Sequence, residues 1–98
     1  MEVFKDLISS SIPVVVMCYA DCCKSCDAIS FVLKQVKAFH GPTIRVVKLD
    51  VEKNRELALN YSVLSVPTVL IFKGGKQLWR QCGKVDTDEL IKIIDLLK

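Results

Sequence analysis

The sequence predicts a single α/β domain in which helices cover both faces of a mixed β-sheet. Apolar residues recur first with helical and then with strand spacing, in the order α-β-α-β-α-β-β-α. The 98 residues suit one domain, residues 1–98, and 51% of them are hydrophobic, with a mean hydropathy of +0.35. This richness in apolar residues favours strands that are buried on both faces.

The first two predicted elements are an amphipathic helix and a buried strand. Residues 2–9 have one apolar helical face, formed by Val3, Phe4, Leu7 and Ile8. Pro13 then opens the β-branched run PVVVMCY at residues 13–19. Such a run is typical of a strand whose two faces are both covered.

A longer helix and a second strand are predicted next. From Cys23 to Phe39 the apolar period is helical, and Gly41-Pro42 ends the helix. The core stripe of this helix is expected to consist of Ile29, Val32, Leu33, Val36 and Phe39. Residues 43–51, TIRVVKLDV, are the second strand, which we expect to lie parallel to the first and at one edge of the sheet.

The last part of the chain predicts a short helix, a hairpin and a terminal helix. Residues 52–61 have helical spacing, and residues 66–82 read as two strands around a Gly-Gly turn, with 76–82 at the other edge of the sheet. Asp86 and Glu89 have the spacing of a capping box and mark the start of the final helix. Its core face is expected to consist of Leu90, Ile93, Ile94 and Leu97.

The charge pattern excludes several classes of function. The 14 basic and 11 acidic residues are interspersed and give a net charge of +3, without the basic stripe typical of nucleic-acid binding. The apolar run at residues 12–18 is too short to span a bilayer. Glu2, Lys5 and Asp6 interrupt any signal-peptide core, so we expect a cytoplasmic protein. Thiols are kept reduced there, which argues against structural disulfides among the five cysteines.

The stretch CCKSC places three cysteines at the start of the second predicted helix. Cys23 and Cys26 are three residues apart, so both sulfurs point to one side of the first turn. Free backbone N–H groups and the positive end of the helix dipole favour a thiolate there, and Lys24 adds a cation. Because the thiolate is the nucleophile in disulfide exchange, the spacing predicts a dithiol redox centre.

A metal site is the alternative from another class. Cys22, Cys23 and Cys26, with Cys82 as a fourth ligand, would hold zinc or an iron–sulfur cluster. The other cysteines and the single histidine form no second CxxC or HxxxH pair, however. A CxxC that follows a strand and opens a helix is the context of a redox motif, so we favour a redox site and no bound metal.

These motifs together resemble the thioredoxin family from about Pro13 to Lys98. YADCCKSC is similar to the family's active-site stretch, and VVKLDVEKN to the strand after the active-site helix. SVPTVLIFKGGKQ resembles the family's cis-proline strand and hairpin, and Gly83 precedes a capped last helix as in the family. The resemblance implies a thioredoxin fold with about four strands and four helices, in which the family's first strand is missing or vestigial because the sequence begins directly with a helix.

The resemblance also assigns roles to particular residues. Cys23 is implied to be the exposed attacking cysteine and Cys26 the resolving one. Pro67 is implied to form a cis peptide bond with Val66, whose backbone pairs with an extended substrate segment. The implied substrate groove consists of Val66, Pro67, Thr68, Cys82 and Gly83.

Two departures from the family concern the proton of the resolving cysteine. Met17 stands where the family has a buried acid that assists proton transfer. Lys48, the usual neighbour of that acid, is present without it. Proton transfer is therefore left to water, to Lys48 or to another group, and we expect a slower resolving step.

Other departures lie within the motif itself. Cys22 replaces the family's Trp, and Lys24-Ser25 replaces Gly-Pro, which frees an N–H and removes a rigid φ. Asp27 stands where a basic residue is common, so its charge opposes the effect of Lys24 on a thiolate. The resemblance suggests that such changes alter the redox potential.

Four further residues have a structural and a functional interpretation each. Cys18 lies in the buried strand and is interpreted as inert core. Cys22 either fills the space of an indole or is an auxiliary thiol, and Cys82 either packs or is a regulatory thiol beside the groove. Trp79, on the edge strand, is interpreted as a cover for the core rather than a partner contact.

The sequence as a whole predicts a protein-disulfide reductase that is a monomer and carries no cofactor except a redox-active disulfide, Cys23–Cys26. Its expected partners are protein disulfides and a thioredoxin-reductase-like electron donor, with no nucleic acid and no membrane. A glutaredoxin-like, glutathione-linked reductase is the closest alternative, although the glutathione-binding Gly-Gly-Asp-like pattern is missing. A redox-inert interaction domain is disfavoured because both CxxC cysteines are present.

Overall fold

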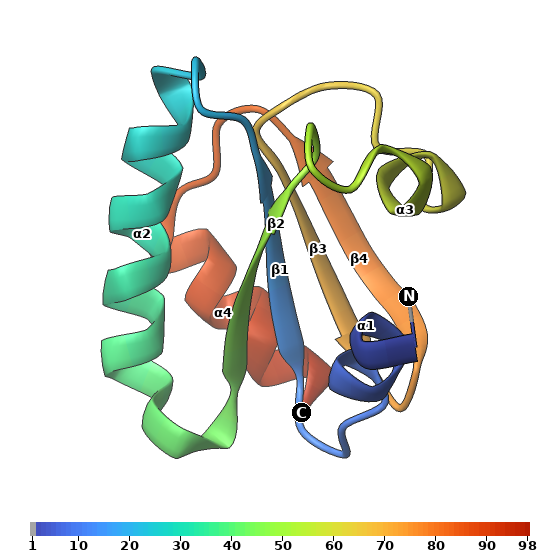
Figure 1. Ribbon diagram of the computed structural model, residues 1–98. Coiled ribbons are helices and arrows are strands. Elements are labelled where there is room, and N and C mark those ends of the chain that lie inside the picture. The colour runs from blue at the N-terminus through green and yellow to red at the C-terminus, as the bar shows by residue number, and fades with distance from the viewer. Residues whose placement is uncertain (1) are drawn as a thin grey trace.

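The protein, described here by a computed structural model of residues 2–98, has a four-stranded mixed sheet (Figure 1). Its strands run in the order β2-β1-β3-β4. They are β1 (Val14–Tyr19), β2 (Arg45–Asp50), β3 (Thr68–Lys73) and β4 (Lys76–Cys82). β1 pairs in parallel with β2 and antiparallel with β3, and β3 pairs antiparallel with β4. The predicted fold and both predicted edge strands are confirmed.

Helices cover both faces of this sheet. The four α-helices are α1 (Glu2–Ile8), α2 (Ser25–His40), α3 (Arg55–Asn60) and α4 (Thr87–Leu97). A short 3₁₀ turn, η1 (Gly41–Thr43), follows α2. α2 and α4 pack on one face of the sheet, and α1 and α3 lie over the other (Figure 1). No helix within the described residues is long and apolar enough to cross a membrane.

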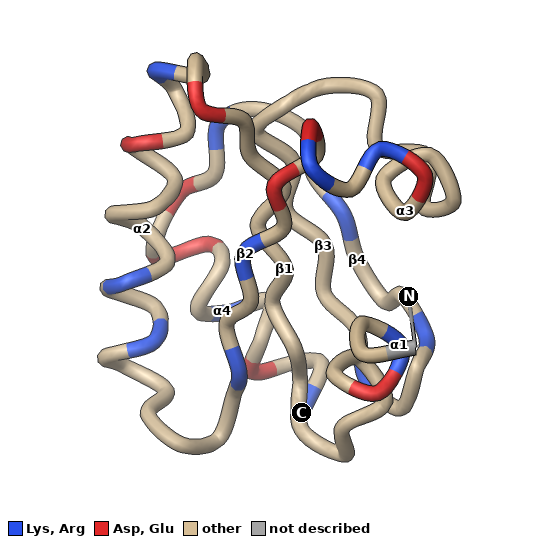
Figure 2. Tube along the Cα trace, in the orientation of Figure 1, with Lys and Arg blue, Asp and Glu red and all other residues tan. Residues whose placement is uncertain are grey.

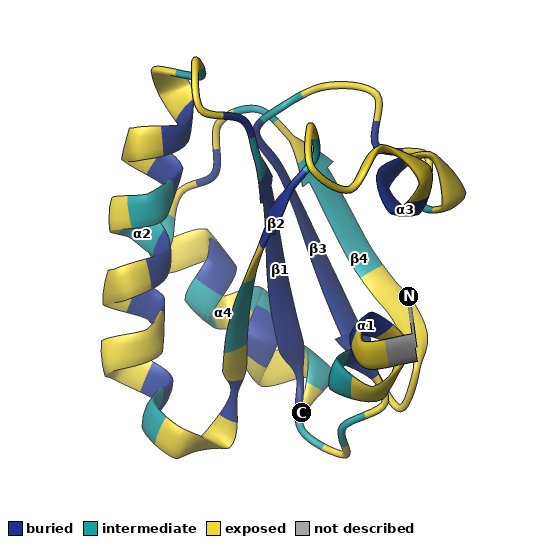
Figure 3. Ribbon diagram, in the orientation of Figure 1, coloured by how far each residue is buried: buried dark blue, intermediate teal, exposed yellow. Residues whose placement is uncertain are grey.

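The central strands β1 and β3 contribute side chains to two hydrophobic clusters, one on each face (Figure 3). Successive side chains of a strand point to opposite faces, so Val15 and Met17 join the cluster under α2 and α4. Val16 and Cys18 join the cluster under α1 and α3. This double burial explains the continuous apolar run of β1, in agreement with the prediction.

Two predicted core residues are exposed, and the structure corrects them. Phe39 is 65% exposed, whereas its neighbour His40 is buried at 5% and lies with Nε2 3.3 Å from the Ile91 carbonyl oxygen. Positions three and four residues after Val36 both suit the helix stripe, and the histidine takes the inner one because it finds a polar partner there. Val3 is 72% exposed, because it lies beside rather than on the face that buries Phe4.

The ends of two helices bear on the site. Asp86 caps α4, since its carboxylate accepts a hydrogen bond from the Glu89 N–H at 3.1 Å, as the capping-box spacing predicts. α2 begins at Ser25 rather than at Cys23. Cys23 therefore lies in the turn before the helix, where its N–H donates to the Ala20 carbonyl at 3.2 Å, and only Cys26 is in the first helical turn.

Candidate redox site

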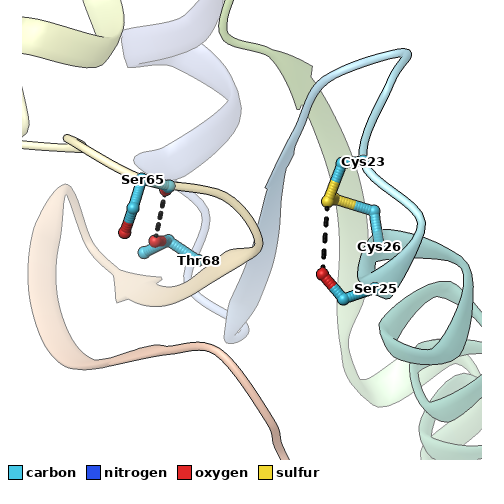
Figure 4. Close-up of a disulfide and its surroundings, with 5 residues drawn as sticks. All are labelled: Cys23, Ser25, Cys26, Ser65 and Thr68. Carbon is cyan, nitrogen blue, oxygen red and sulfur yellow. Dashed lines mark hydrogen bonds between the residues drawn. A yellow bond between two sulfur atoms is a disulfide. The ribbon is translucent and has the colours of Figure 1, made fainter.

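The candidate site is a disulfide between Cys23 and Cys26 at the junction of β1 and α2 (Figure 4). Their Cα atoms are 5.4 Å apart, within the range that a disulfide requires. The two sulfurs differ in access, because Cys26 is 4% exposed and packs in the core, whereas Cys23 is half-buried. The arrangement presents Cys23 to an incoming molecule and keeps Cys26 behind it.

Ser25 contacts the more accessible sulfur. Its hydroxyl oxygen lies 3.5 Å from Cys23 Sγ, and it is the donor because a disulfide sulfur has no hydrogen (Figure 4). Ser25 replaces the proline that the family has at this position, and proline has no hydroxyl. The site therefore has a local hydrogen-bond donor 3.5 Å from the sulfur that is the more accessible of the two.

An apolar groove lies next to Ser25, which contacts the Cys23 sulfur. The Val66–Pro67 peptide bond is cis, and Pro67 and Gly83 line the groove together with residues of α2. The full lining is Ser25, Ala28, Ile29, Pro67, Gly83 and Lys84, around a volume of about 300 Å³. Of the implied groove residues, Val66, Thr68 and Cys82 are not part of this lining, and Thr68 is fully buried.

A second cavity, of about 210 Å³, reaches both sulfurs from the side of β2. It is lined by Met17, Tyr19, Ala20, Asp21, Cys23, Cys26, Asp27, Ser30 and Lys48. Met17 brings no ionisable group to it, but Lys48 and two carboxylates do. The Lys48 ammonium donates to Ser30 Oγ at 3.0 Å, which orients the cation within the cavity wall.

The structure thus places some of the predicted motif residues at the sulfurs and others away from them. Asp27 and Lys48 line the cavity, whereas Cys22 and Lys24 are exposed and belong to neither lining. Sequence reasoning missed Ser30, although its position four residues after Cys26 places it on the same helix face.

Two other cysteines lie on the α1–α3 face of the sheet, across β3 from each other. Cys18 on β1 pairs in register with Thr68, which pairs with Cys82 on β4. Burial raises the pKa of the Cys18 thiol to about 11, as expected for an inert core residue. The pKa of the exposed Cys82 thiol is lowered, first by the Thr68 hydroxyl and further by Ser65 and Arg80. Thr68 Oγ1 lies 3.6 Å from Cys82 Sγ and shares its one proton between this sulfur and the Ser65 carbonyl oxygen at 2.8 Å.

The metal alternative finds no support in this geometry. Within residues 2–98, no three His, Cys, Asp or Glu side chains are grouped so that they would hold a metal ion. Cys82 is on the far edge strand, and Cys22 is exposed beside an already paired Cys23.

Comparison with known proteins agrees with the site. The family model described as Thioredoxin matches residues 1–96. Thioredoxin of Chlamydia trachomatis serovar D is 37% identical over 93 residues, which cover 95% of this chain and 89% of that protein. A bifunctional thioredoxin reductase/thioredoxin of Mycobacterium leprae is 36% identical over 80 residues, 82% of this chain but 18% of that protein. A solved mutant thioredoxin from Halobacterium salinarum NRC-1 matches with a TM-score of 0.87 at 30% identity, covering 98% of this chain and 83% of that one.

The fold, the paired cysteines and these relatives agree on one kind of chemistry. The protein is a thiol–disulfide oxidoreductase that acts on protein disulfides. By the match of a family model to nearly all of its residues, the chain belongs to the thioredoxin family.

Proposed function

We propose that Cys23 attacks the disulfides of protein substrates and that Cys26 resolves the mixed disulfide. The observation that carries this assignment is the unequal access of the two sulfurs, with Cys26 buried at 4% and Cys23 half-buried. The groove beside Pro67 and Gly83 gives a substrate segment room next to the disulfide. A nucleophile has to meet its substrate, whereas a resolving thiol has to meet only its neighbour.

The exchange proceeds in two balanced steps. The Cys23 thiolate attacks one substrate sulfur, the substrate S–S bond breaks, and the other substrate sulfur leaves as a thiolate. Cys26 then loses its proton to water in the cavity that reaches both sulfurs, and its thiolate attacks Cys23 Sγ. The second substrate sulfur leaves, the substrate has gained two electrons, and the protein is left with the Cys23–Cys26 disulfide.

The same proposal covers the electron supply. The redox couple consists of the chain's own two sulfurs, so no bound cofactor is required. A thioredoxin-reductase-like enzyme is the proposed donor of the two electrons that reopen the disulfide, and the relative that joins a reductase and a thioredoxin in one chain supports this pairing. A reducing compartment suits such a cycle, so we assign the protein to the cytoplasm.

A trapping experiment tests the roles of the cysteines. In a Cys26→Ser variant the resolving thiol is absent, so mixed disulfides with substrate proteins are expected to accumulate on Cys23, as read by mass spectrometry. Accumulation on Cys22 instead would contradict the assignment.

A reductase assay tests the electron donor. We expect the protein to reduce insulin when a thioredoxin reductase is the electron source. With glutathione alone we expect only weak insulin reduction. Activity with glutathione only would favour the glutaredoxin-like alternative.

A further inference from the structure

A groove between α2 and β2 combines an apolar floor with three lysines. Its volume is about 210 Å³, and its lining consists of Ser30, Leu33, Lys34, Lys37, Val46 and Lys48. Leu33 is buried and Val46 half-buried, whereas all three lysines are exposed. We call this feature the lysine groove. No acidic residue lines it.

The positive charge of the lysine groove is not neutralised by the protein. Both ion pairs within residues 2–98 use Asp95, on α4, and neither involves these lysines. Lys37 Nζ donates to the carbonyl oxygens of Gly41 and Ile44 at 2.8 and 2.7 Å, and Lys48 Nζ donates to Ser30. These hydrogen bonds go to uncharged oxygens, so they hold the ammonium groups in place without cancelling their charge.

The lysine groove continues into the cavity of the redox site. Ser30 and Lys48 line both spaces, so a molecule bound at Cys23 has a path along α2 into the lysine groove. The sign of the charge changes along this path. Asp21 and Asp27 line the cavity at the sulfurs together with Lys48, whereas only lysines supply charge in the lysine groove. The coloured trace of α2 shows an acidic position near its start and basic positions farther along it (Figure 2).

We infer that the lysine groove binds an acidic side chain of the protein substrate. Lys34 follows Cys26 by eight helical residues, which corresponds to about 12 Å along the axis. An extended segment covers that distance in roughly three or four residues. The preferred substrate therefore has Asp or Glu three or four residues from the cysteine that Cys23 attacks. This inference rests on the proposed function.

The size of the effect is that of exposed ion pairs. One such pair changes a binding constant by a factor of up to about five, and the gain disappears as salt shortens the screening length to about 3 Å at 1 M. Because Lys34 and Lys48 both flank the expected position of the acid, we expect a preference of about three- to tenfold at low ionic strength.

Matched peptides test the inference. Each peptide carries one cysteine in a mixed disulfide with 2-hydroxyethanethiol. The two peptides of a pair differ only in having Glu or Gln four residues from that cysteine. In one series this residue is on the N-terminal side of the cysteine, and in the other series it is on the C-terminal side. The reduced protein is expected to cleave the Glu peptide of one series about three- to tenfold faster in kcat/KM at low salt, and to cleave both equally at about 1 M salt. A Glu-to-Gln ratio of one in both series at low salt overturns the inference.

Two charge variants locate the effect. Lys34→Glu is expected to bring the ratio to one or below, because it reverses a charge of the lysine groove. Lys76→Glu makes the same change in net charge on the exposed hairpin of the opposite sheet edge and is expected to keep the wild-type ratio. If both variants lose the preference equally, net charge and not the lysine groove is responsible, and the inference is wrong.

A neutral small disulfide separates this inference from the proposed function. Wild-type protein that reduces neither insulin nor bis(2-hydroxyethyl) disulfide contradicts the proposed function itself. Wild-type protein that reduces it but does not distinguish the two peptides contradicts only the docking of an acidic side chain.

Discussion

Ser25 is the residue whose side chain forms a hydrogen bond to the Cys23 sulfur. Its hydroxyl is 3.5 Å from Cys23 Sγ, and a donor at this place stabilises the thiolate once the disulfide is reduced. We expect Ser25→Ala to slow the alkylation of Cys23 at neutral pH about threefold, in line with the loss of one modest hydrogen bond. Ser25→Thr retains a hydroxyl and is expected to restore most of the rate. Equal rates in all three proteins would show that the contact has no effect on reactivity.

Lys48 is the residue that we expect to assist the resolving step, because Met17 stands where the family has a buried acid. It lines the cavity that Cys26 shares, and Met17 offers no group that would accept a proton. We expect Lys48→Met to slow the resolving step several-fold, because a positive charge in this cavity stabilises the negative charge that develops on the Cys26 sulfur during the step. Lys48→Arg keeps the charge and serves as control. The measurement is single-turnover release of product from the mixed disulfide, and an equal loss in Lys48→Arg would point to a purely structural role.

Cys18 and Cys82 are expected to differ strongly in reactivity. The pKa of Cys18 is raised to about 11 by burial, so at neutral pH it is a protonated thiol without access to solvent. The pKa of Cys82 is lowered by the Thr68 hydrogen bond, so its thiolate forms at lower pH than that of an ordinary thiol. In the oxidised protein, iodoacetamide is expected to modify Cys82 and to spare Cys18 until the protein unfolds.

The role of Thr68 in this difference has its own check. Thr68→Val keeps the shape of the side chain and removes the donor, so the pKa of Cys82 rises and its alkylation near neutral pH slows by roughly threefold. Peptide mapping by mass spectrometry gives both rates. Rapid labelling of Cys18 in the folded protein would contradict its placement in the core.

Among the elements, α4 depends on a single capping side chain. Asp86 accepts from the Glu89 N–H, and α4 supplies the buried Leu90 and Ile94 to the core under α2. Asp86→Ala is expected to lower the free energy of unfolding by about 1 kcal/mol, measured by urea denaturation. Asp88→Ala, two residues farther along in the first turn of α4 and without a capping bond, is the matched control and is expected to lower the free energy of unfolding by less. Equal losses would assign the effect to helix-end charge instead of the cap.

Elements were predictable from the sequence to the extent that local patterns determine them. The buried run of β1, the Gly-Gly hairpin and the Asp86 cap each follow from a few adjacent residues. Local patterns did not predict that His40 is buried instead of Phe39. The burial of His40 depends on the carbonyl oxygen of Ile91, which is 51 residues away in the sequence. α2 also begins two residues later than the sequence predicts, since the turn at Cys23 carries no sequence signal against a helix.

At the scale of the whole molecule, the sequence predicts the redox pair better than it predicts the surroundings of that pair. The spacing of Cys23 and Cys26 predicts a dithiol centre, and the order and type of the elements predict the mixed sheet. Pro67 and Gly83 entered the expected site only through the family resemblance, because their approach to α2 is a tertiary contact. The lysine groove and the cavity of the redox site share Ser30 and Lys48 in their linings. This sharing is also a tertiary feature, because it depends on how α2 lies against β2.

The position of β2 at the open edge of the sheet has a consequence for self-association. No strand within residues 2–98 pairs with its outer side, so its outward N–H and C=O groups offer a template on which a strand of another copy would add. Arg45 and Lys48 are exposed on this strand, and like charges on two copies repel when such edges meet. We therefore expect Lys48, which also lines the cavity of the redox site, and Arg45 at the other end of the strand to limit edge-to-edge aggregation.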